Sequence, residues 1–403
     1  MFEYYLGNAR KAMDSFRFFT GNLFVKRDYD ILFYYPAHFN RAEGKNPFFE
    51  PLYKICDKNG ISYLIIEEPY YDKKTERNDK TVPFDFPLIV LMLFRKIIPI
   101  KKFEHRYAQD RFIARILKPL LFKKLTFRNA IVLSNSMISL LRGINEKADI
   151  YDYQHGVIFL GHKGYFTDRM EAARDIRLNR VNLLLYGQGF QKMLHEHDAS
   201  GYYKNHTFVL GFDVQKNRPP IQAKDKILFT LQFTGTDEFG DHQDDWLKII
   251  EEFFDKYTRF FQEHGITVLL KKHPRHNDAV DISSLYRYPF TTDAQAPLES
   301  LFKECFLHLT FYSSSLFDAS AKAIPTILWQ HQYSLAHTFV ESFHYPLGVF
   351  DTLSIAGKIE EYLTNESCYE MDRNKVATWY DTLYQPLDEK FFVEKFSSRH
   401  MQS

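Results

Sequence analysis

Residues 306–329 read FLHLTFYSSSLFDASAKAIPTILW, and their pattern decides the fold. An apolar stretch, FLHLTFY, precedes a helix-like stretch, SLFDASAKA, and a second apolar stretch, PTILW, follows at 325–329. Short apolar strands that alternate with helices are typical of parallel sheets with crossover helices. The stretch therefore predicts a strand–helix–strand unit in which three adjacent serines, Ser313, Ser314 and Ser315, follow the first strand.

The same alternation runs through both halves of the chain. In the N-terminal half, strands are expected at residues 30–36, 62–68, 129–135, 148–154, 182–187 and 207–212. In the C-terminal half, strands are expected at 226–233 and 266–274, with a strongly periodic helix at 244–265 between them. This pattern predicts an α/β protein with two Rossmann-like domains that face each other across a cleft.

A polar stretch, DVQKNRPPIQAKDK at 213–226, separates the two halves. It contains two adjacent prolines and has no apolar periodicity, which is typical of a linker. We therefore predict one domain over residues 1–212 and a second domain over residues 227–380, with the linker over 213–226 between them. A helical tail is expected over residues 381–403.

The overall composition argues against several classes of protein. The 403 residues have a formal net charge of +1, so the total charge provides no attraction to nucleic acid. Three widely spaced cysteines form no CxxC pair, which argues against a disulfide framework or a zinc site and fits a reducing compartment. The longest apolar run, residues 86–94, is far shorter than the roughly 18 residues of a membrane span, and no signal peptide is evident. We expect a cytoplasmic protein.

One segment, residues 95–128, is strongly basic. It contains eleven Lys and Arg residues against two acids, Glu104 and Asp110, and Leu, Ile and Phe are interspersed among them. This pattern is typical of a basic amphipathic surface that lies on anionic lipid. The alternative is an ordinary solvated basic face with a core-facing stripe. We expect peripheral contact with the inner face of the plasma membrane, and no nucleic-acid partner, because no recognition module accompanies the charge.

Two polar motifs of the C-terminal half follow predicted strands, where ligands bind in open α/β sheets. Ser313, Ser314 and Ser315 precede a helix, and a helix start can either be capped by a hydroxyl or bind phosphate. One serine suffices for a cap, so three favour a phosphate site. The second motif is KKHPR at 271–275, in which Lys271, Lys272, His273 and Arg275 surround Pro274. This cluster is suited to a diphosphate, although it also fits a solvated strand end.

Candidate catalytic groups come from two other loops. Gln154, His155 and Gly156 follow a predicted strand, and His155 at that position could act as a general base on an acceptor hydroxyl. Asp237 and Glu238 follow the first strand of the C-terminal half and could supply a carboxylate base, or simply precede an acid-capped helix. Neither a GxGxxG fingerprint nor a P-loop occurs, and we expect no metal site and no cofactor beyond a nucleotide-linked substrate.

These motifs resemble those of GT-B glycosyltransferases of bacterial surface polysaccharide synthesis. A strand before His273-Pro274, and a second strand before serines about forty residues later, is similar to CDP-glycerol glycerophosphotransferases and to CMP-sugar transferases for Kdo and sialic acid. In those families the two motifs hold the nucleotide phosphate, and a His-Gly pair, here His155-Gly156, carries the base. Thr310-Phe311-Tyr312 replaces an aspartate that often precedes the serines in the glycerophosphotransferases.

The resemblance implies a metal-independent glycosyltransferase in which residues 1–212 form the acceptor-binding domain and residues 227–380 form the nucleotide-donor-binding domain. Its expected donor is a nucleotide sugar, with a CMP-linked sugar as the first expectation. Its expected acceptor is a glycan or lipid-linked glycan of a capsule, lipopolysaccharide or related surface polymer. Two other interpretations stay open: a polyol-phosphate transferase that uses CDP-glycerol or CDP-ribitol, and a non-catalytic GT-B scaffold of a polysaccharide assembly complex.

Overall fold

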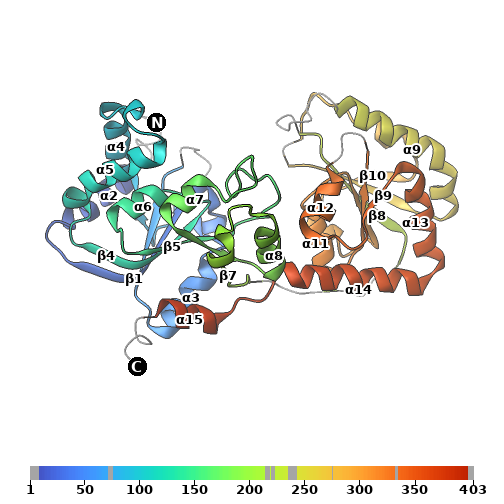
Figure 1. Cartoon of the computed structure of the whole chain (residues 1–403). Coiled ribbons are helices and arrows are strands. Elements are labelled where there is room, and N and C mark those ends of the chain that lie inside the picture. Colours follow the sequence, from blue (N-terminus) through green and yellow to red (C-terminus); the bar gives the residue numbers. More distant parts are fainter. Residues whose placement is uncertain are drawn as a thin grey trace. The chain divides into compact units, whose positions relative to one another are not determined.

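The computed structural model describes residues 9–70, 76–213, 218, 223–234, 243–274, 276–331 and 335–397 (Figure 1). The chain divides into two compact units. The N-terminal unit comprises Met1–Asp213 together with Gln385–Ser403, and the C-terminal unit comprises Val214–Tyr384. Each unit has its own parallel sheet covered by helices, as the alternation of apolar and helical stretches predicts.

The N-terminal unit is built on a seven-stranded sheet in the order β3-β2-β1-β4-β5-β6-β7. Its strands are β1 (Arg27–Pro36), β2 (Tyr63–Glu68), β3 (Val82–Pro83), β4 (Leu125–Leu133), β5 (Asp149–Tyr153), β6 (Val181–Leu185) and β7 (Thr207–Val209). Residues 31–35 of β1 are all buried without alternation, because helices cover both faces of the sheet.

The helices of this unit lie on both faces of the sheet. They are α2 (Ala9–Gly21), α3 (Glu50–Asn59), α4 (Asp85–Ile97), α5 (Arg106–Leu121), α6 (Ile138–Ile144), α7 (Arg174–Asn179), α8 (Gln188–His197) and α15 (Glu389–Phe396). Helices α5 and α6 lie on one face, and α3 and α15 lie on the other (Figure 1). The strand order reverses between β1 and β4, so polar loops at the carboxyl ends of these central strands are the expected place for a ligand.

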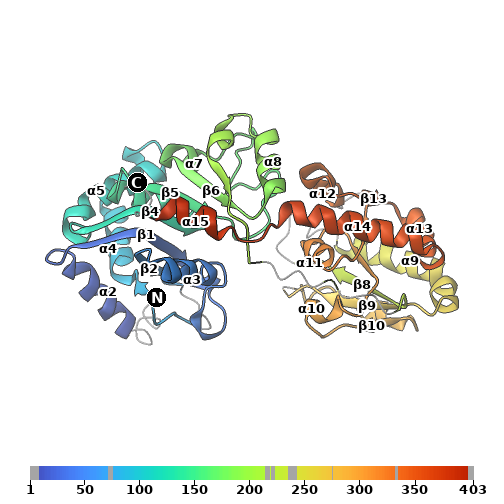
Figure 2. The same ribbon diagram turned by 90° about the horizontal axis from the view of Figure 1, so that it is seen from below.

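The C-terminal unit has a six-stranded sheet in the order β10-β9-β8-β11-β12-β13. Its strands are β8 (Lys226–Leu231), β9 (Thr267–Lys272), β10 (Thr291–Asp293), β11 (Leu307–Thr310), β12 (Thr326–Trp329) and β13 (Val349–Phe350). Its helices are α9 (Gln243–Glu263), α10 (Leu298–Leu301), α11 (Ser315–Ala321), α12 (Ala336–Phe343), α13 (Thr352–Thr364) and α14 (Glu366–Leu383) (Figure 2). Helices α9 and α13 pack on one face of this sheet around Phe229, Phe253 and Trp329, and α11 packs on the other.

After α14 the chain returns to the N-terminal unit, where it is held by backbone contacts. The amide of Phe212 donates to the carbonyl of Gln385 at 2.8 Å, and the amide of Asp388 donates to the carbonyl of Leu210 at 2.8 Å. Gly211 has a φ of +85°, and a Cβ at this position would lie 2.1 Å from the carbonyl oxygen of Pro386. Glycine is therefore required for the C-terminal segment to approach this closely.

Most predicted strands and helices appear within a few residues of their expected positions. The short strands β3, β10 and β13 were not predicted, because two or three residues carry no readable periodicity. The predicted tail over residues 381–403 is divided, since α14 ends at Leu383 in the C-terminal unit and residues from Gln385 onward belong to the N-terminal unit. The linker prediction over 213–226 includes residues outside those that the structure describes.

Candidate functional site

A cavity of about 310 Å³ opens at the carboxyl edge of the C-terminal sheet. Its lining brings together most residues of the two predicted phosphate motifs. The lining residues are Thr230, Leu231, Gln232, Lys271, Lys272, His273, Pro274, Pro297, Leu298, Ser313 and Ser315. Lys271 and His273 are half-buried, whereas Lys272 and Pro274 are exposed. Arg275, the last residue of the KKHPR motif, lies outside the described residues, as do Asp237 and Glu238.

The two motifs meet because their strands flank the same central strand. In the parallel register, Thr230 of β8 lies opposite Lys271 of β9 on one side and opposite Thr310 of β11 on the other. The carboxyl ends of all three strands therefore point to one edge. The KKHP turn after β9 and the serine loop after β11 both open into the cavity at that edge. This is the point at which the strand order of the sheet reverses, where ligands bind in open α/β sheets.

The three serines differ in their surroundings. Ser313 and Ser315 are buried and line the cavity, whereas Ser314 is exposed and is not among the lining residues. The Oγ of Ser313 accepts from the amide of Ser315 at 3.2 Å, so Ser313 fulfils the local role that a capping hydroxyl usually has. The side chain of Ser314 makes no cap hydrogen bond, although it occupies the N-cap position of α11. Capping therefore explains part of the role of Ser313. It does not explain why the side chain of Ser315 is buried beside the cavity.

A buried polar network extends from Ser315 into the sheet. The Oγ of Ser315 lies 3.3 Å from Oγ1 of Thr230, which lies 3.0 Å from Nε2 of His308. On the other side of the imidazole, Nδ1 of His308 lies 3.0 Å from Oγ1 of Thr326. Burial lowers the pKa of His308 to about 3, so the ring is neutral at physiological pH. A neutral imidazole donates through one nitrogen and accepts through the other, which fixes the direction of the hydroxyls around it.

Sequence reasoning did not identify Thr230, Gln232 or His308. His308 and Thr310 are the polar residues within the apolar stretch FLHLTFY, and both are fully buried. A polar residue in an otherwise apolar strand is a signal that it has a partner inside the protein. The carboxamide of Gln232 accepts from the amide of Tyr312 at 3.1 Å, which holds the start of the serine loop against the end of β8.

The electrostatics of the cavity favour an anion. Lys271 and Lys272 are among the lining residues, and no Asp or Glu is among those that the structure describes there. The Nζ of Lys271 donates to the carbonyl of Gln295 at 3.2 Å, and this bond orients the ammonium group. A backbone carbonyl has no net charge, so it does not neutralise the positive charge of Lys271. Two ammonium groups, an imidazole and several hydroxyls form a donor set that matches phosphate oxygens.

In the N-terminal unit, the predicted base His155 follows β5 in a loop that is well anchored. Gln154 donates to the carbonyl of Gly156 at 2.8 Å and accepts from the amide of Tyr186 at 2.9 Å, so its role in this unit is to hold the loop. The ring of His155 packs edge-on against Phe39, with 5.2 Å between ring centroids. Burial, followed by the charges of His162 and His38, lowers the pKa of His155 to about 4. The imidazole is therefore unprotonated at neutral pH, as a proton acceptor must be.

A buried carboxyl group lies on the same strand as this loop, and sequence reasoning missed it. Asp152 of β5 accepts from the amide of Asn135 at 2.8 Å and from the hydroxyl of Tyr165 at 2.9 Å. Burial raises its pKa to about 7, because the two hydrogen bonds offset only part of the lost hydration. Asp152 thereby joins the loop after β4 to the segment that follows His155.

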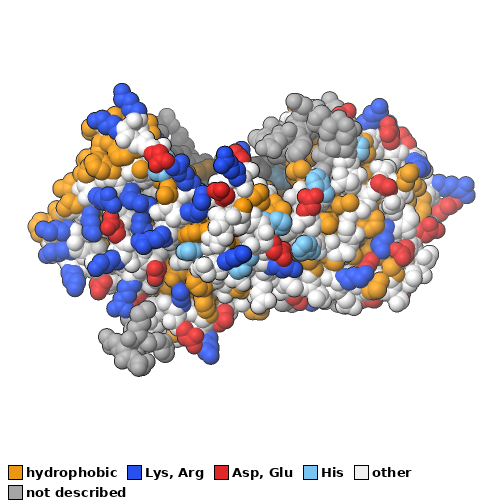
Figure 3. Space-filling view, in the orientation of Figure 1, with side chains coloured by type: hydrophobic (Ala, Val, Ile, Leu, Met, Phe, Trp, Pro, Cys, Tyr) orange, Lys and Arg blue, Asp and Glu red, His pale blue; other side chains and the backbone are white. Residues whose placement is uncertain are grey.

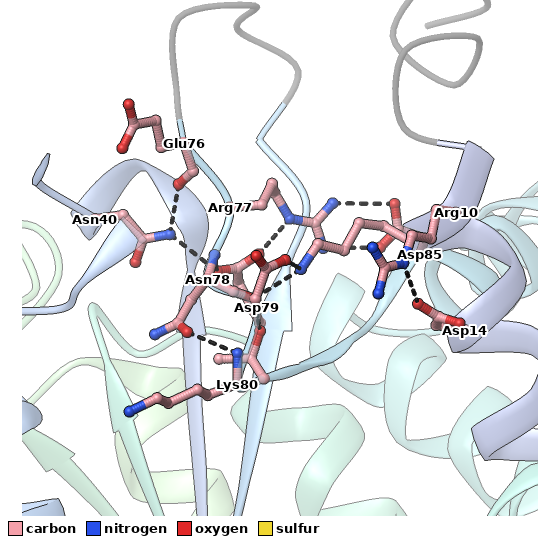
Figure 4. Close-up of polar contacts among 12 residues, drawn as sticks. Arg10, Asp14, Asn40, Glu76, Arg77, Asn78, Asp79, Lys80 and Asp85 are labelled. Atoms are coloured by element: carbon pink, nitrogen blue, oxygen red, sulfur yellow. Dashed lines mark hydrogen bonds and ion pairs between the residues drawn. The ribbon is translucent and has the colours of Figure 1, made fainter. Parts of the chain in front are cut away.

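A second buried cluster lies at the carboxyl ends of β1 and β2. Arg77 forms an ion pair with Asp85, in which Nη2 and Oδ2 are 2.9 Å apart (Figure 4). It also pairs with Glu67, and all three side chains are buried. Asn40 donates to Glu67 at 2.9 Å and to the carbonyl of Glu76 at 2.9 Å. Breaking a buried ion pair is costly, because it leaves an uncompensated charge inside the protein. These ion pairs therefore hold the segment that begins at Glu76 against the edge of the sheet. Within the described residues, no group of three or more His, Cys, Asp or Glu side chains is arranged to hold a metal ion.

Comparisons with known proteins identify the fold. No protein-family model and no curated protein sequence matches the chain. The calicheamicin glycosyltransferase CalG4 aligns over 93% of this chain and 99% of its own, with a TM-score of 0.51 and 13% identity. MnaA from S. aureus, solved with UDP, aligns over 93% of this chain and 98% of its own, with a TM-score of 0.51 and 12% identity. A candidate UDP-N-acetylglucosamine 2-epimerase from Listeria monocytogenes aligns over 91% and 94%, with a TM-score of 0.51 and 10% identity.

At these levels of identity the similarity concerns the fold. It agrees with the two parallel α/β sheets of six and seven strands described above. The chain therefore consists of two Rossmann-like units, as found in GT-B glycosyltransferases, and the prediction of two α/β domains with parallel sheets is confirmed.

Proposed function

We propose that this protein is a glycosyltransferase that binds a nucleotide-sugar donor in the cavity of the C-terminal unit. A CMP-linked sugar is the preferred donor, and a growing surface glycan is the acceptor. The observation that carries the proposal is the convergence of Lys271, Lys272 and His273 with Ser313 and Ser315 around one cavity. These side chains come from two loops about forty residues apart in sequence, and together they provide donors for a phosphate group.

In this proposal the donor phosphate lies among the two ammonium groups and the serine hydroxyls. When the bond between the sugar carbon and the phosphate oxygen breaks, its electron pair and the negative charge pass to the departing nucleotide. Preoriented donors stabilise such developing charge best, because they do not need to reorganise during the reaction. The network of Ser315, Thr230 and His308 provides this preorientation. Lys271 and Lys272 supply the positive charge, which makes a metal ion unnecessary in the proposed mechanism.

We assign the deprotonation of the acceptor hydroxyl to His155 of the N-terminal unit. The O–H bond of the acceptor breaks as the new C–O bond forms, and the proton passes to the imidazole. The neutral state of His155 at physiological pH fits this role. Its Nδ1 is buried and has no hydrogen-bond partner among the described residues, so in this proposal the acceptor hydroxyl meets Nε2. Asp237 and Glu238 stay alternative candidates for the base.

Two other activities, the epimerisation of a UDP-sugar and the transfer of a polyol phosphate from a CDP-linked donor, also use a nucleotide-linked substrate. The fold similarity includes a glycosyltransferase and a candidate UDP-sugar epimerase at equal TM-scores, so the fold does not separate them. The motif resemblance of His273-Pro274 and Ser313–Ser315 favours transfer from a cytidine nucleotide. It also supports a CDP-glycerol or CDP-ribitol polyol-phosphate transferase as the second candidate. A non-catalytic scaffold is the candidate of a different class.

A donor panel separates these candidates. The full chain is incubated with CMP-sialic acid, CMP-Kdo, CDP-glycerol, CDP-ribitol and UDP-N-acetylglucosamine, each with and without a mixture of glycan acceptors. Released CMP and UDP and the C2 epimer of the UDP-sugar are then quantified. Release of CMP from a CMP-sugar supports the proposal, whereas release from CDP-glycerol or CDP-ribitol alone identifies the second candidate. Epimerisation of the UDP-sugar, or no reaction and no nucleotide binding, overturns it.

A further inference from the structure

Helix α4 is apolar around most of its circumference, and apolar side chains near its C-terminal end are exposed. Its sequence between Asp85 and Arg95 is FPLIVLMLF, and a helix that is apolar all round is normally buried. Here Pro87, Leu88 and Leu91 are buried, whereas Leu93 is 53% exposed and Ile97 is 75% exposed. Ile100, in the 3₁₀ turn that follows, is 42% exposed. These three exposed side chains fall within eight residues at the end of the helix and in the turn after it.

Lysines lie directly beside this apolar surface. Lys96, Lys101 and Lys102 are exposed, and none of them forms an ion pair with a residue that the structure describes. No acidic residue occurs between Leu93 and Lys102. Figure 3 shows hydrophobic and basic side chains next to one another over α4 and α5 of the N-terminal unit. We call these six residues, Leu93, Lys96, Ile97, Ile100, Lys101 and Lys102, the tip patch.

The tip patch is held in place by the start of α5. Arg95 forms a two-point ion pair with Asp110, in which both N–O distances are 2.8 Å. The carboxamide of Gln109 donates to the carbonyls of Arg95 and Ile98, at 3.3 and 2.5 Å. These contacts fix the end of α4 and the turn after it, so little ordering is needed before the patch binds a partner. A preorganised surface loses less conformational entropy on binding.

We propose that the tip patch docks the N-terminal unit on an anionic lipid bilayer. Apolar side chains that enter the headgroup region gain free energy from the area removed from water, and adjacent lysines pair with anionic headgroups. Charge complementarity selects this partner, since the patch is uniformly basic around its apolar side chains. No helix that the structure describes is long and apolar enough to cross a bilayer, so the contact is peripheral. The inference does not depend on the proposed donor site, which lies in the other unit.

The sequence predicts membrane contact over residues 95–128. The tip patch is smaller than this segment and begins before it. Leu93 precedes that segment. Within it, Arg95 is engaged with Asp110, and Arg115 is engaged with Glu146 at 2.7 Å. Ile113 and Leu117 of α5 are buried in the unit, whereas Phe112 and Leu120 of the same helix are exposed. We assign the primary lipid contact to the end of α4 and the turn after it, because three exposed apolar side chains and three lysines without an ion pair to a described residue fall there within ten residues.

Vesicle flotation tests this assignment with the full chain. Vesicles of phosphatidylcholine alone are compared with vesicles that also contain phosphatidylglycerol, at low and high salt. We expect binding only to the anionic vesicles and weakening by salt. The triple variant Lys96→Gln, Lys101→Gln and Lys102→Gln should bind on the order of a hundredfold more weakly, at roughly fivefold per lysine. Leu93→Ser with Ile97→Ser should also lower binding, and this loss should persist at both salt concentrations.

Matched control variants come from exposed positions on the C-terminal unit. Lys248→Gln removes an exposed lysine, and Leu353→Ser removes an apolar side chain that is 69% exposed. Both controls should bind vesicles like the wild type. The proposal is overturned if the wild type does not bind anionic vesicles, or if the control and tip variants lose binding equally. It is also overturned if the tip variants change a dimer to a monomer in sedimentation while vesicle binding stays unchanged, since a second copy then occupies the patch.

Discussion

The Nε2 of His308 lies 3.0 Å from Oγ1 of Thr230, and both side chains are buried beside the cavity of the C-terminal unit. This contact connects a strand interior to the floor of the candidate donor site, because Thr230 also contacts Ser315. The imidazole is neutral, since burial lowers its pKa to about 3. The donor site is therefore supported by a polar network that remains uncharged throughout the physiological range.

His308→Leu should destabilise the protein by about 1–3 kcal/mol at pH 7, because buried hydroxyls of Thr230 and Thr326 lose their partner. The pH dependence has a defined sign. The pKa of His308 is lower in the folded state than in the unfolded state, so its stabilising effect is lost as pH falls below about 6.5. Between pH 7 and pH 5 the advantage of the wild type over His308→Leu should shrink by about 2 kcal/mol. Urea unfolding at the two pH values measures this difference, and an advantage that grows on acidification contradicts the neutral assignment.

Asp152→Asn should show the opposite dependence on pH. The pKa of Asp152 is raised to about 7 in the folded state, so the folded protein retains a proton that the unfolded chain has lost above about pH 4. The contribution of Asp152 to stability should therefore decline as pH rises from about 4 to about 7. From pH 5 to pH 7, the wild type should lose about 2 kcal/mol relative to Asp152→Asn, because the slope of about 1.4 kcal/mol for each pH unit flattens near the folded pKa. Unfolding free energies that run parallel for the two proteins over this range would show that Asp152 is ionised in the fold.

Gly211→Ala should detach the C-terminal segment from the N-terminal unit. A methyl group at this position meets the carbonyl of Pro386, and the positive φ adds further strain. We expect a loss of more than 1 kcal/mol and faster proteolysis around α15. Gly357→Ala is the matched control, since this exposed glycine lies within α13 and an added Cβ there meets no atom within 4 Å. Unlike Gly211→Ala, it should slightly stabilise its helix. Equal protease resistance of the two variants contradicts the role assigned to Gly211.

His155→Gln should lower kcat by about 100-fold or more, which is the usual contribution of a general base, and should leave nucleotide affinity unchanged. Because the pKa of His155 is about 4, the wild-type rate should show no protonation step near pH 6.5. His264→Gln, at an exposed position on the C-terminal unit, is the control and should retain full activity. The assignment fails if turnover survives in His155→Gln, or if this variant loses activity only through weaker nucleotide binding.

Much of the fold follows from the apolar periodicity of the sequence, but the path of the C-terminal segment does not. The strands at 226–231, 267–272 and 307–310 are readable because each is an apolar run bounded by polar residues. The return of the chain through Pro386 depends on a single glycine that permits a close backbone approach, and no sequence pattern marks it. Local periodicity cannot show which distant segment packs against a given unit.

The candidate site was predictable at the level of motifs and not of individual side chains. The serine loop and the KKHP turn both follow parallel strands, and adjacency to β8 then brings them to one edge. That Ser314 does not line the cavity depends on the turn geometry after β11, which the run of three serines does not specify. His308 and Asp152 were missed because their roles depend on burial and partners from other strands.

The central claim is that the cavity lined by Ser313 and Ser315 binds the nucleotide donor, and affinity for CMP and CDP tests it most directly. Calorimetric titration should compare the wild type with Ser313→Ala, Ser315→Ala and Ser314→Ala, which differ by single hydroxyls in one loop. We predict that the wild type binds a cytidine nucleotide and that Ser313→Ala and Ser315→Ala each bind it roughly 10-fold more weakly, as expected for a lost hydrogen bond to a charged group. Ser314→Ala should bind like the wild type, because its side chain is exposed outside the cavity. Absence of binding by the wild type, or equal affinity of all four proteins, would contradict the assignment of this cavity as the donor site.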